Sequence, residues 1–178
     1  VDDVVFESIP WAVADQFESL DEAAEEAAKA ISEGKVIGWF QGRSEVGQRA
    51  LDSRSFLADP RDANMRSYIN QYVKAREWWR PLAPSILASE AGNWFENLDN
   101  DEEGGGQSPY MSVTSYIKMD KVHQVPSIVH VDGSARLQTV HEETNQKYYE
   151  LIKEFKKITN CPFLVNTSFN VRGQPIVC

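Results

Sequence analysis

The chain has 178 residues, 42% of them hydrophobic and 25% charged, which is the composition of an ordinary globular protein of about one domain with a sizeable core. Its net charge of −9 argues against non-specific binding to nucleic acid or to an anionic membrane, because both call for a basic surface. No apolar run is long enough to span a bilayer and no basic-then-apolar leader opens the sequence, so we expect no membrane association.

The first half of the chain alternates between helical and strand patterns. Ser19 and Glu22 have the spacing of a capping box, which predicts a helix over 23–31 that ends at Gly34. The apolar run at 36–40 predicts a buried strand. The other elements expected here are a short helix or turn at 50–57 leading into a strand that ends at Ala58, an amphipathic helix at 63–73, a strand at 85–88 and a short helix at 90–97.

The second half begins with an acidic, glycine-rich segment, residues 99–106, for which we expect a loop. Alternating apolar residues predict a half-exposed strand at 112–119. The interleaving of helices and strands predicts an α/β protein, bordering on α+β, with a mixed sheet in a single domain. The remaining elements are strands at 128–131, 137–140 and 163–165, and a helix at 145–158 whose packed side carries Tyr148, Tyr149, Ile152, Phe155 and Ile158.

The two cysteines, Cys161 and Cys178, have neither the spacing of a metal site nor that of a disulfide framework. We expect both thiols to be reduced and structural, as in a cytoplasmic protein. The sequence starts without Met and stops soon after Pro175, so we also expect a fragment of a longer protein.

Residues 38–51 carry the most informative local pattern. An apolar run leads into Gly42 and Gly47, with Arg43 and Arg49 beside them. Glycines allow a backbone to approach a ligand closely, and arginines offer a fixed fork of donors for phosphate or carboxylate. Two interpretations are open here, namely a tight turn with two surface arginines or an anion-binding site.

The distribution of charge favours a local anion site. Residues 1–34 contain ten Asp or Glu and one lysine, whereas residues 43–80 contain eight Lys or Arg against five acids. Four polar clusters, each following an expected strand or helix, would suit a phosphorylated or carboxylated small molecule. They are Arg43, Glu45 and Arg49; Lys74, Arg76 and Arg80; Asp132, Gly133, Ser134 and Arg136; and Asn166, Thr167, Ser168 and Asn170.

Simpler interpretations exist for several of these residues. Taken singly, Lys74 and Arg76 are better explained as solvated charges at a helix end, and Asn166 and Asn170 serve equally well as turn residues. The glycines match neither a Walker A loop nor a dinucleotide fingerprint.

Two other features have weak functional interpretations. Trp78 and Trp79 fit a core or partner surface better than a base-stacking platform. His130 and Asp132 would face the same side of a strand, but a metal or acid–base role for His130 is the less favoured interpretation.

At the four clusters the sequence resembles the O-carbamoyltransferase family, which includes the nodulation-factor, cephamycin and tobramycin carbamoyltransferases. Residues 42–51 resemble its G-R-x-E-x-G-P-R-A-L-G motif. The similarity runs from about residue 24 to the C-terminus and keeps the order of the family's motifs. The other matching blocks are residues 64–66, residues 74–77 with 80–85, residues 131–140 and residues 166–171.

The resemblance implies a C-terminal, YrdC-like domain, a twisted mixed sheet flanked by helices. In the family this domain binds ATP, with Mg²⁺, and carbamoyl phosphate, and it forms carbamoyl adenylate. A larger N-terminal domain containing iron or another divalent metal then passes the carbamoyl group to a small-molecule hydroxyl. The positions that match the family's ligand-binding residues are Arg49, Lys74, Arg80, Arg136 and Ser168, with Arg43, Asn166 and Asn170 as their neighbours and with Lys74 and Arg80 as the catalytic pair.

The sequence departs from the family pattern at two positions in the first motif. Gln48 replaces the usual proline and Asp52 the usual glycine, and Arg43 with Glu45 is expected to form an ion pair that shapes this loop. The transferase domain is expected to lie outside this chain, so the chain alone should not complete the transfer. Two rival functions stay open: a non-catalytic module that binds a phosphorylated ligand or RNA, and an interaction domain that uses Trp78 and Trp79.

Overall fold

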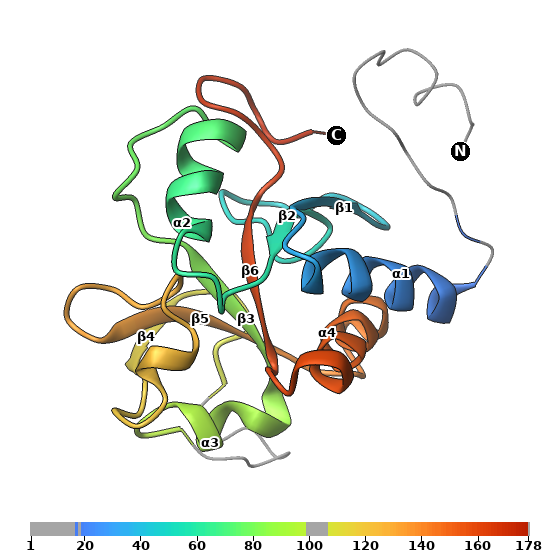
Figure 1. The fold of residues 1–178 in the computed structure, drawn as a ribbon. Helices are drawn as coiled ribbons and strands as arrows, with labels where there is room; N and C mark the ends of the chain where they lie inside the picture. Colours follow the sequence, from blue (N-terminus) through green and yellow to red (C-terminus); the bar gives the residue numbers. More distant parts are fainter. Residues whose placement is uncertain (1–16, 18, 99–106, 178) are drawn as a thin grey trace.

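In the computed structural model, which describes residues 17, 19–98 and 107–177, the described chain forms a six-stranded open sheet with the order β1-β2-β6-β3-β5-β4 (Figure 1). Neighbouring strands are antiparallel except β3 and β5, which are parallel. This arrangement confirms the predicted α/β class with a mixed sheet. The strands are β1 Ile37–Phe40, β2 Arg54–Ala58, β3 Ala83–Leu87, β4 Val113–Tyr116, β5 Ser134–Val140 and β6 Phe163–Ser168.

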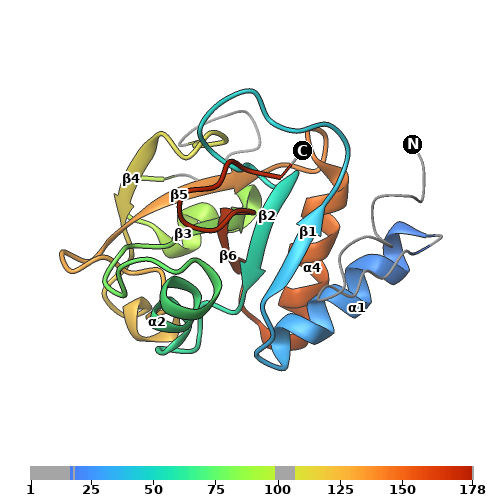
Figure 2. The same ribbon diagram turned by 90° about the horizontal axis from the view of Figure 1, so that it is seen from above.

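Helices cover both faces of the sheet. The two long helices, α1 (Leu20–Ser32) and α4 (Gln146–Thr159), lie side by side against one face, and the smaller helices lie beyond the other (Figures 1 and 2). On that second face the Trp94 ring meets Phe163 edge-on, with 4.8 Å between ring centroids. The smaller helices are α2 (Met65–Tyr68) with its π-helical continuation η1 (Ile69–Val73), and α3 (Ala91–Trp94), which follows the 3₁₀ turn η2 (Ala88–Glu90); a further 3₁₀ turn, η3, spans Val122–Gln124.

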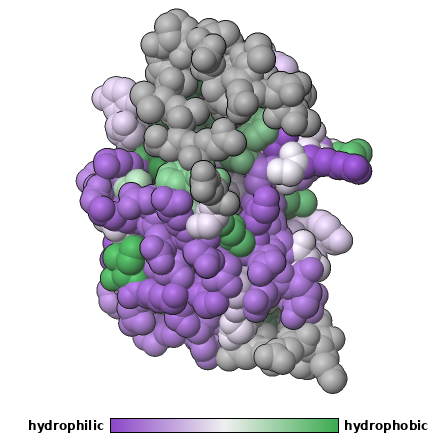
Figure 3. Space-filling model, turned by 90° about the vertical axis from the view of Figure 1, so that its right-hand side faces the viewer, coloured by the Kyte–Doolittle hydropathy of each residue, from purple (hydrophilic) through white to green (hydrophobic). Residues whose placement is uncertain are grey.

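Helix α1 begins and ends where the sequence predicts. Ser19 Oγ accepts a hydrogen bond from Glu22 N at 3.2 Å. At the other end Gly34 has φ +86°, and the amide of Lys35 bonds Ala30 O in a Schellman motif. Hydrophilic side chains make up most of the surface that the described residues show on the side of the molecule where α1 and α4 lie (Figure 3).

Helix α4 shares with α1 one apolar core against the sheet. Its buried residues are Tyr148, Leu151, Ile152 and Phe155, so the predicted packed side is correct in part. Leu151 belongs to it as well, whereas Ile158 is 54% exposed. Ile158 lies in the last turn of α4, at the edge of the apolar stripe and beyond the last buried residue, Phe155.

Two predicted strands need correction, and one open alternative is decided. Residues 128–131 form no strand, because the chain makes a tight turn in which Gly133 N bonds His130 O and β5 then begins at Ser134. Strand β1 is an edge strand with alternating half-buried and exposed residues, and not the buried strand expected. Residues 50–57 follow the turn-then-strand alternative, since β2 runs from Arg54.

The remaining predictions hold with shifts at the ends. The helix expected at 63–73 is present as α2 followed by η1, and the helix expected at 90–97 is limited to η2 and α3. The acidic segment at 99–106 and Cys178 lie outside the described residues. Cys161 is a free thiol that burial holds in its neutral form, raising its pKa to about 12. In the described ranges, every helix is too short or too polar to cross a membrane.

Candidate functional site

The C-terminal end of β6 meets the N-terminal ends of β2, β3 and β5 at one end of the sheet. Strand β6 is antiparallel to β2 and β3, and β3 is parallel to β5. Ala83 lies opposite Asn166 across one neighbour, and Ser85 lies opposite Gln138 across the other. The segments that carry the predicted site residues therefore converge at this end.

Lys74 is buried at this end and joins two of the predicted clusters. Its side chain is only 3% exposed although it directly follows a helix. The ammonium donates to Asn170 Oδ1 at 2.7 Å, to Ser168 Oγ at 3.1 Å and to the Ser168 carbonyl. The interpretation of Lys74 as a solvated helix-end charge is therefore wrong, and its contacts with β6 place it at the sheet end.

At neutral pH the charged and the neutral forms of Lys74 are present in similar amounts. Burial, followed by the nearby cation Arg76, lowers the pKa of Lys74 to about 7. The three oxygen acceptors around Nζ match the three protons of an ammonium group. An anion arriving at this end would favour the charged form and would hold the proton in place.

Asn70 orders the segment that follows Lys74. It is fully buried, and its amide donates to the carbonyls of Trp78 at 3.0 Å and Arg80 at 2.8 Å. Its Oδ1 accepts from Arg76 Nε at 2.7 Å. Ala75 between the two cations has φ +50°, a costly conformation for a residue with a Cβ. Asn70 thus holds the segment that carries Arg76 and Arg80 in one shape.

Arg80 remains available at the surface of this segment. Glu77 lies 3.7 Å from Arg80 Nε and 3.8 Å from Arg172 Nη1, both loose, exposed ion pairs. Trp78 and Trp79 are each 60% exposed, which rules out the core interpretation of these two residues.

Arg136 and Arg49 form a second cationic centre. Burial lowers the pKa of Arg136, and the positive charge of Arg49 lowers it further. Within the part of the chain that the structure describes, neither arginine forms an ion pair. Two guanidinium groups close together without an acidic partner are typical of sites for multiply charged anions. Arg136 also lines a pocket of about 170 Å³ with His130, Thr114 and residues 81–83.

The glycine–arginine loop is shaped by two residues, but not by the predicted ion pair. Glu45 Oε1 accepts from the amides of Leu51 at 2.8 Å and Ser53 at 2.7 Å. Within residues 19–98 and 107–177, Arg43 forms no ion pair, and its side chain is exposed. The expected Arg43–Glu45 pair is therefore wrong: Arg43 is exposed, and Glu45 instead accepts two backbone amides through Oε1.

Arg54 connects the two ends of the same loop through hydrogen bonds to backbone carbonyls. Its Nη1 donates to the carbonyls of Gln41 and Ser53, both at 2.8 Å, and its Nη2 donates to Gly42 O at 3.2 Å. The guanidinium stacks on the Phe40 ring at 3.4 Å from the centroid. This buried cation, absent from the sequence prediction, fixes both ends of the loop that carries Arg49.

A buried polar network lies beneath the sheet end. Asn166 is 1% exposed, and its amide donates to Ser85 Oγ at 3.1 Å and Gln138 Oε1 at 3.0 Å. Gln138 in turn donates to Asp52 Oδ2 at 3.1 Å. The turn interpretation of Asn166 is therefore wrong, since the residue lies inside β6 and connects three strands.

Asp52 occupies a backbone position suited to glycine. Its φ is +100°, and its side chain is 6% exposed. Burial raises its pKa to about 7, the hydrogen bond from Gln138 opposes this rise, and Glu45 adds to it. The departure from the family's glycine thus places a strained, weakly acidic carboxyl beside the loop.

Several buried polar atoms at this end have no hydrogen-bond partner within the described residues. They include Arg54 Nε, Ser55 Oγ, Asn166 Oδ1 and Arg136 Nε. Buried polar atoms in folded proteins are nearly always bonded, so such a concentration indicates a surface that is completed by a ligand or water. Phosphate oxygens would match the Arg136 donor, and a hydroxyl or amide group the Asn166 acceptor.

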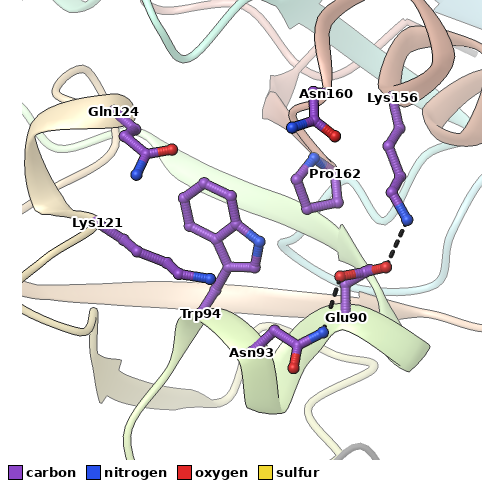
Figure 4. A pocket seen from close by; sticks show the side chains of 8 residues that line it. All are labelled: Glu90, Asn93, Trp94, Lys121, Gln124, Lys156, Asn160 and Pro162. Atoms are coloured by element: carbon purple, nitrogen blue, oxygen red, sulfur yellow. Dashed lines mark hydrogen bonds and ion pairs between the residues drawn. The ribbon is translucent and has the colours of Figure 1, made fainter.

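A larger pocket lies at the opposite end of the sheet, where β3 ends and β6 begins (Figure 4). It measures about 320 Å³ and is lined by Glu90, Trp94, Lys121, Lys156 and others. Its cations are already engaged, because Lys156 pairs with Glu90 and Lys121 lies over the Trp94 ring. Charge therefore favours the smaller pocket beside Arg136 as the ligand site.

The structure separates the predicted residues into three groups. Arg43 lies on the exposed loop without an ion pair to a described residue, and buried Asn166 supports the site through its hydrogen bonds to Ser85 and Gln138. Asn70, Ser85 and Gln138 were missed, although the alternation in β5 could have placed Gln138 on the face of Arg136. The predicted residues that the sheet end gathers are Lys74, Ser168, Asn170, Arg80, Arg136 and Arg49.

Comparison with known proteins agrees with these features. The family described as "Carbamoyltransferase C-terminus" matches residues 28–178. Nodulation protein NolNO of Sinorhizobium fredii is 46% identical over 96% of the chain, and nodulation protein NolO of Bradyrhizobium diazoefficiens is 48% identical over 88%. An uncharacterized protein of Synechocystis, sll1178, is 46% identical over 85%. The chain covers 25%, 28% and 27% of the lengths of these relatives, respectively.

Proposed function

The chain belongs to the family of carbamoyltransferase C-terminal domains, and from this premise we propose that it binds ATP and carbamoyl phosphate and forms carbamoyl adenylate. The observation that carries the proposal is the pair of cationic centres at one end of the sheet. Lys74 with Ser168 and Asn170 forms one, and Arg136 with Arg49 forms the other.

The spacing of the two centres fits two phosphorylated substrates bound side by side. Ser168 and Arg136 lie on the two strands that flank β3, so these strands are roughly 10 Å apart at about 4.8 Å per step. One centre would hold the triphosphate and the other the carbamoyl phosphate. Mg²⁺ would enter with the nucleotide, bound mainly by phosphate oxygens.

The protein's contribution to the reaction is positioning and charge. Overall, ATP, carbamoyl phosphate and one water give carbamoyl adenylate, pyrophosphate and inorganic phosphate. Negative charge builds on the phosphoryl oxygens as the bond to pyrophosphate breaks, and fixed cations lower the free energy of that state. Lys74 and Arg80 are the proposed catalytic cations, and no side chain has to act as a nucleophile.

The relatives are about four times as long as the chain, so the second half of the reaction is assigned to another part of such a protein. There the carbamoyl group would pass to a hydroxyl of a small molecule, with help from iron or another divalent metal. That part of the protein would choose the acceptor.

The decisive test is exchange of labelled pyrophosphate into ATP by the 178-residue chain. The proposal predicts exchange that requires carbamoyl phosphate and Mg²⁺ and is lost in Lys74→Met, while Lys147→Ala, a change on the exposed surface of α4, retains it. ATP binding without any exchange would contradict adenylate formation. Calorimetric binding of a short RNA duplex in place of ATP would favour the RNA-binding alternative.

A further inference from the structure

The pocket beside Arg136 is too small for a nucleotide. Its volume of about 170 Å³ is below the roughly 300 Å³ at which pockets for drug-sized ligands begin. Residues 81–83 form an apolar wall, and Thr114, His130 and Arg136 supply the polar lining. The pocket is therefore suited to a small, partly polar group next to an anion.

A hydrogen-bonded chain from Asp132 fixes the proton on His130. Ser134 Oγ donates its single proton to Asp132 Oδ1 at 2.7 Å. The same oxygen lies 3.1 Å from His130 Nδ1, so it can only accept there and Nδ1 carries the imidazole proton. In the neutral ring this leaves Nε2 as an unprotonated acceptor.

The turn that carries these residues is tightly ordered. His130 N bonds Ser134 O at 2.7 Å, and Ser134 N bonds Asp132 Oδ1 at 3.0 Å. Gly133 at φ +85° allows the reversal between them. Two hydrogen bonds to Ser134 therefore fix His130, one from its backbone amide and one from Nδ1 of its ring. A ring that orients a ligand has to be fixed in this way.

The surroundings keep this imidazole neutral. Burial is the main cause that lowers the pKa of His130, and Arg136 and Arg66 lower it further, while Asp132 acts in the opposite direction. Arg66 is held nearby by its hydrogen bond to Val129 O at 3.1 Å. Nε2 of His130 is therefore an uncharged hydrogen-bond acceptor close to the cations Arg136 and Arg66.

An acceptor at this place needs a donor from the ligand. Phosphate oxygens are acceptors themselves, so they bind to Arg136 and not to Nε2. Of the two proposed substrates, only the adenosine part of ATP and the amide of carbamoyl phosphate carry N–H or O–H donors at neutral pH. The size of the pocket excludes adenosine, which leaves the amide.

We propose, on the basis of the proposed function, that the pocket is the subsite for the carbamoyl group and that His130 selects carbamoyl phosphate by accepting a hydrogen bond from its amide. Arg136 binds the phosphate of the same molecule, and residues 81–83 cover the carbamoyl plane. Acetyl phosphate has the same phosphate and a similar shape, but it carries a methyl group where the amide would be. The site therefore discriminates between the two acyl phosphates through a single acceptor.

The test measures binding of carbamoyl phosphate and acetyl phosphate to the 178-residue chain and to two matched variants. His130→Asn keeps a polar group at the position of Nδ1 but removes the atom at Nε2, whereas His130→Gln can offer an acceptor at the Nε2 position. We expect the preference of the wild-type chain for carbamoyl phosphate to fall about tenfold in His130→Asn, the value of roughly one hydrogen bond. His130→Gln should restore part of it, and His123→Asn, a change at an exposed histidine, should leave it unchanged.

The pH profile supplies a readout that a purely structural role would not move. The preference should be constant above the ordinary histidine pKa of 6.5 and should vanish only at lower pH, when Nε2 becomes protonated. Affinity for acetyl phosphate should not fall over that range, because a cationic ring attracts phosphate.

The outcomes separate the two proposals. If the chain binds ATP and carbamoyl phosphate but His130→Asn keeps the preference, the role of His130 is overturned and the proposed function stands. A chain that binds neither ligand overturns both. Circular dichroism of each variant verifies that a lost preference does not reflect unfolding.

Discussion

The ammonium of Lys74 lies 2.7 Å from Oδ1 of Asn170, although the two residues are 96 positions apart in the chain. This contact ties the end of η1 to the segment after β6. Asn170 is held in turn, because its Nδ2 donates to Gln174 O at 2.7 Å. The arrangement gives the sheet end a buried cation whose charge depends on pH near neutrality.

The first prediction is that ATP binding takes up a proton above pH 7. The pKa of Lys74 is about 7 in the free protein, and a bound triphosphate raises it because the anion favours the ammonium form. At pH 8 the calorimetric binding enthalpy should therefore vary with the ionisation enthalpy of the buffer, with a slope of up to about one proton. At pH 6 Lys74 is already charged, so its share of the uptake should be absent.

The control for this prediction is the variant Lys74→Met beside Lys147→Ala. The nucleotide titrates as well, so only the difference between the variants reports on Lys74. A buffer dependence in Lys74→Met equal to that of the wild-type chain would show that Lys74 does not change its charge on binding.

The second prediction is that Asp52→Gly stabilises the protein. Relief of the left-handed conformation at φ +100° should contribute about 1–3 kcal/mol to the free energy of unfolding. The gain should be larger at pH 8 than at pH 5. The folded state keeps the Asp52 proton up to about pH 7 and the unfolded chain releases it near 3.8, so the wild-type protein loses stability as pH rises through this window.

Denaturant unfolding at several pH values measures both effects. Asn97→Gly is the matched control, because Asn97 has φ +60° but carries no titratable group. Its effect should not depend on pH. A pH-independent gain in Asp52→Gly would mean that the carboxyl of Asp52 is not the source of the pH effect.

The third prediction concerns the cation beneath the glycine–arginine loop. Arg54→Lys should lower the free energy of unfolding by about 1–3 kcal/mol, because a single ammonium on a flexible stem cannot replace a planar fork that reaches three carbonyls. Arg43→Lys, on the exposed part of the same loop, should change stability by less than about 0.5 kcal/mol. Chemical denaturation measures both variants. Equal losses of stability in Arg54→Lys and Arg43→Lys would show that Arg54 does not hold the loop closed.

The fourth prediction is that Asn70→Asp disorders the segment that presents Arg80. The new carboxylate would face the carbonyls of Trp78 and Arg80 in place of a donor, which costs about 1–3 kcal/mol of stability for the unsatisfied groups. Hydrogen exchange of the amides in residues 74–80 should become faster than in the wild-type chain. Unchanged exchange would show that the segment is held by other contacts.

Local sequence signals predicted most of the fold. The cap of α1 at Ser19, its end at Gly34 and the helix at 146–159 depend on contacts within a few residues, which is why the sequence reveals them. The strand expected at 128–131 failed for the opposite reason. Ile128 is fully buried, and an apolar residue looks the same in a buried turn as in a strand.

The site was predicted as a set of residue types rather than as an arrangement. Resemblance to a family located Lys74, Ser168 and Arg136, but the charge balance of Lys74 depends on burial by distant segments. Arg54 and Asn70 were missed because their partners are backbone carbonyls, which leave no mark in the sequence.

Calorimetric titration of ATP into the chain and three variants tests the central claim most directly. The account predicts that the wild-type chain and Lys147→Ala bind ATP alike, and that Lys74→Met binds it at least about tenfold more weakly, as expected when one charge-assisted phosphate contact is lost. Arg136→Ala, which removes the proposed contact with carbamoyl phosphate, should bind ATP as the wild-type chain does. Equal ATP affinity in all four proteins would contradict the placement of the nucleotide site at this end of the sheet.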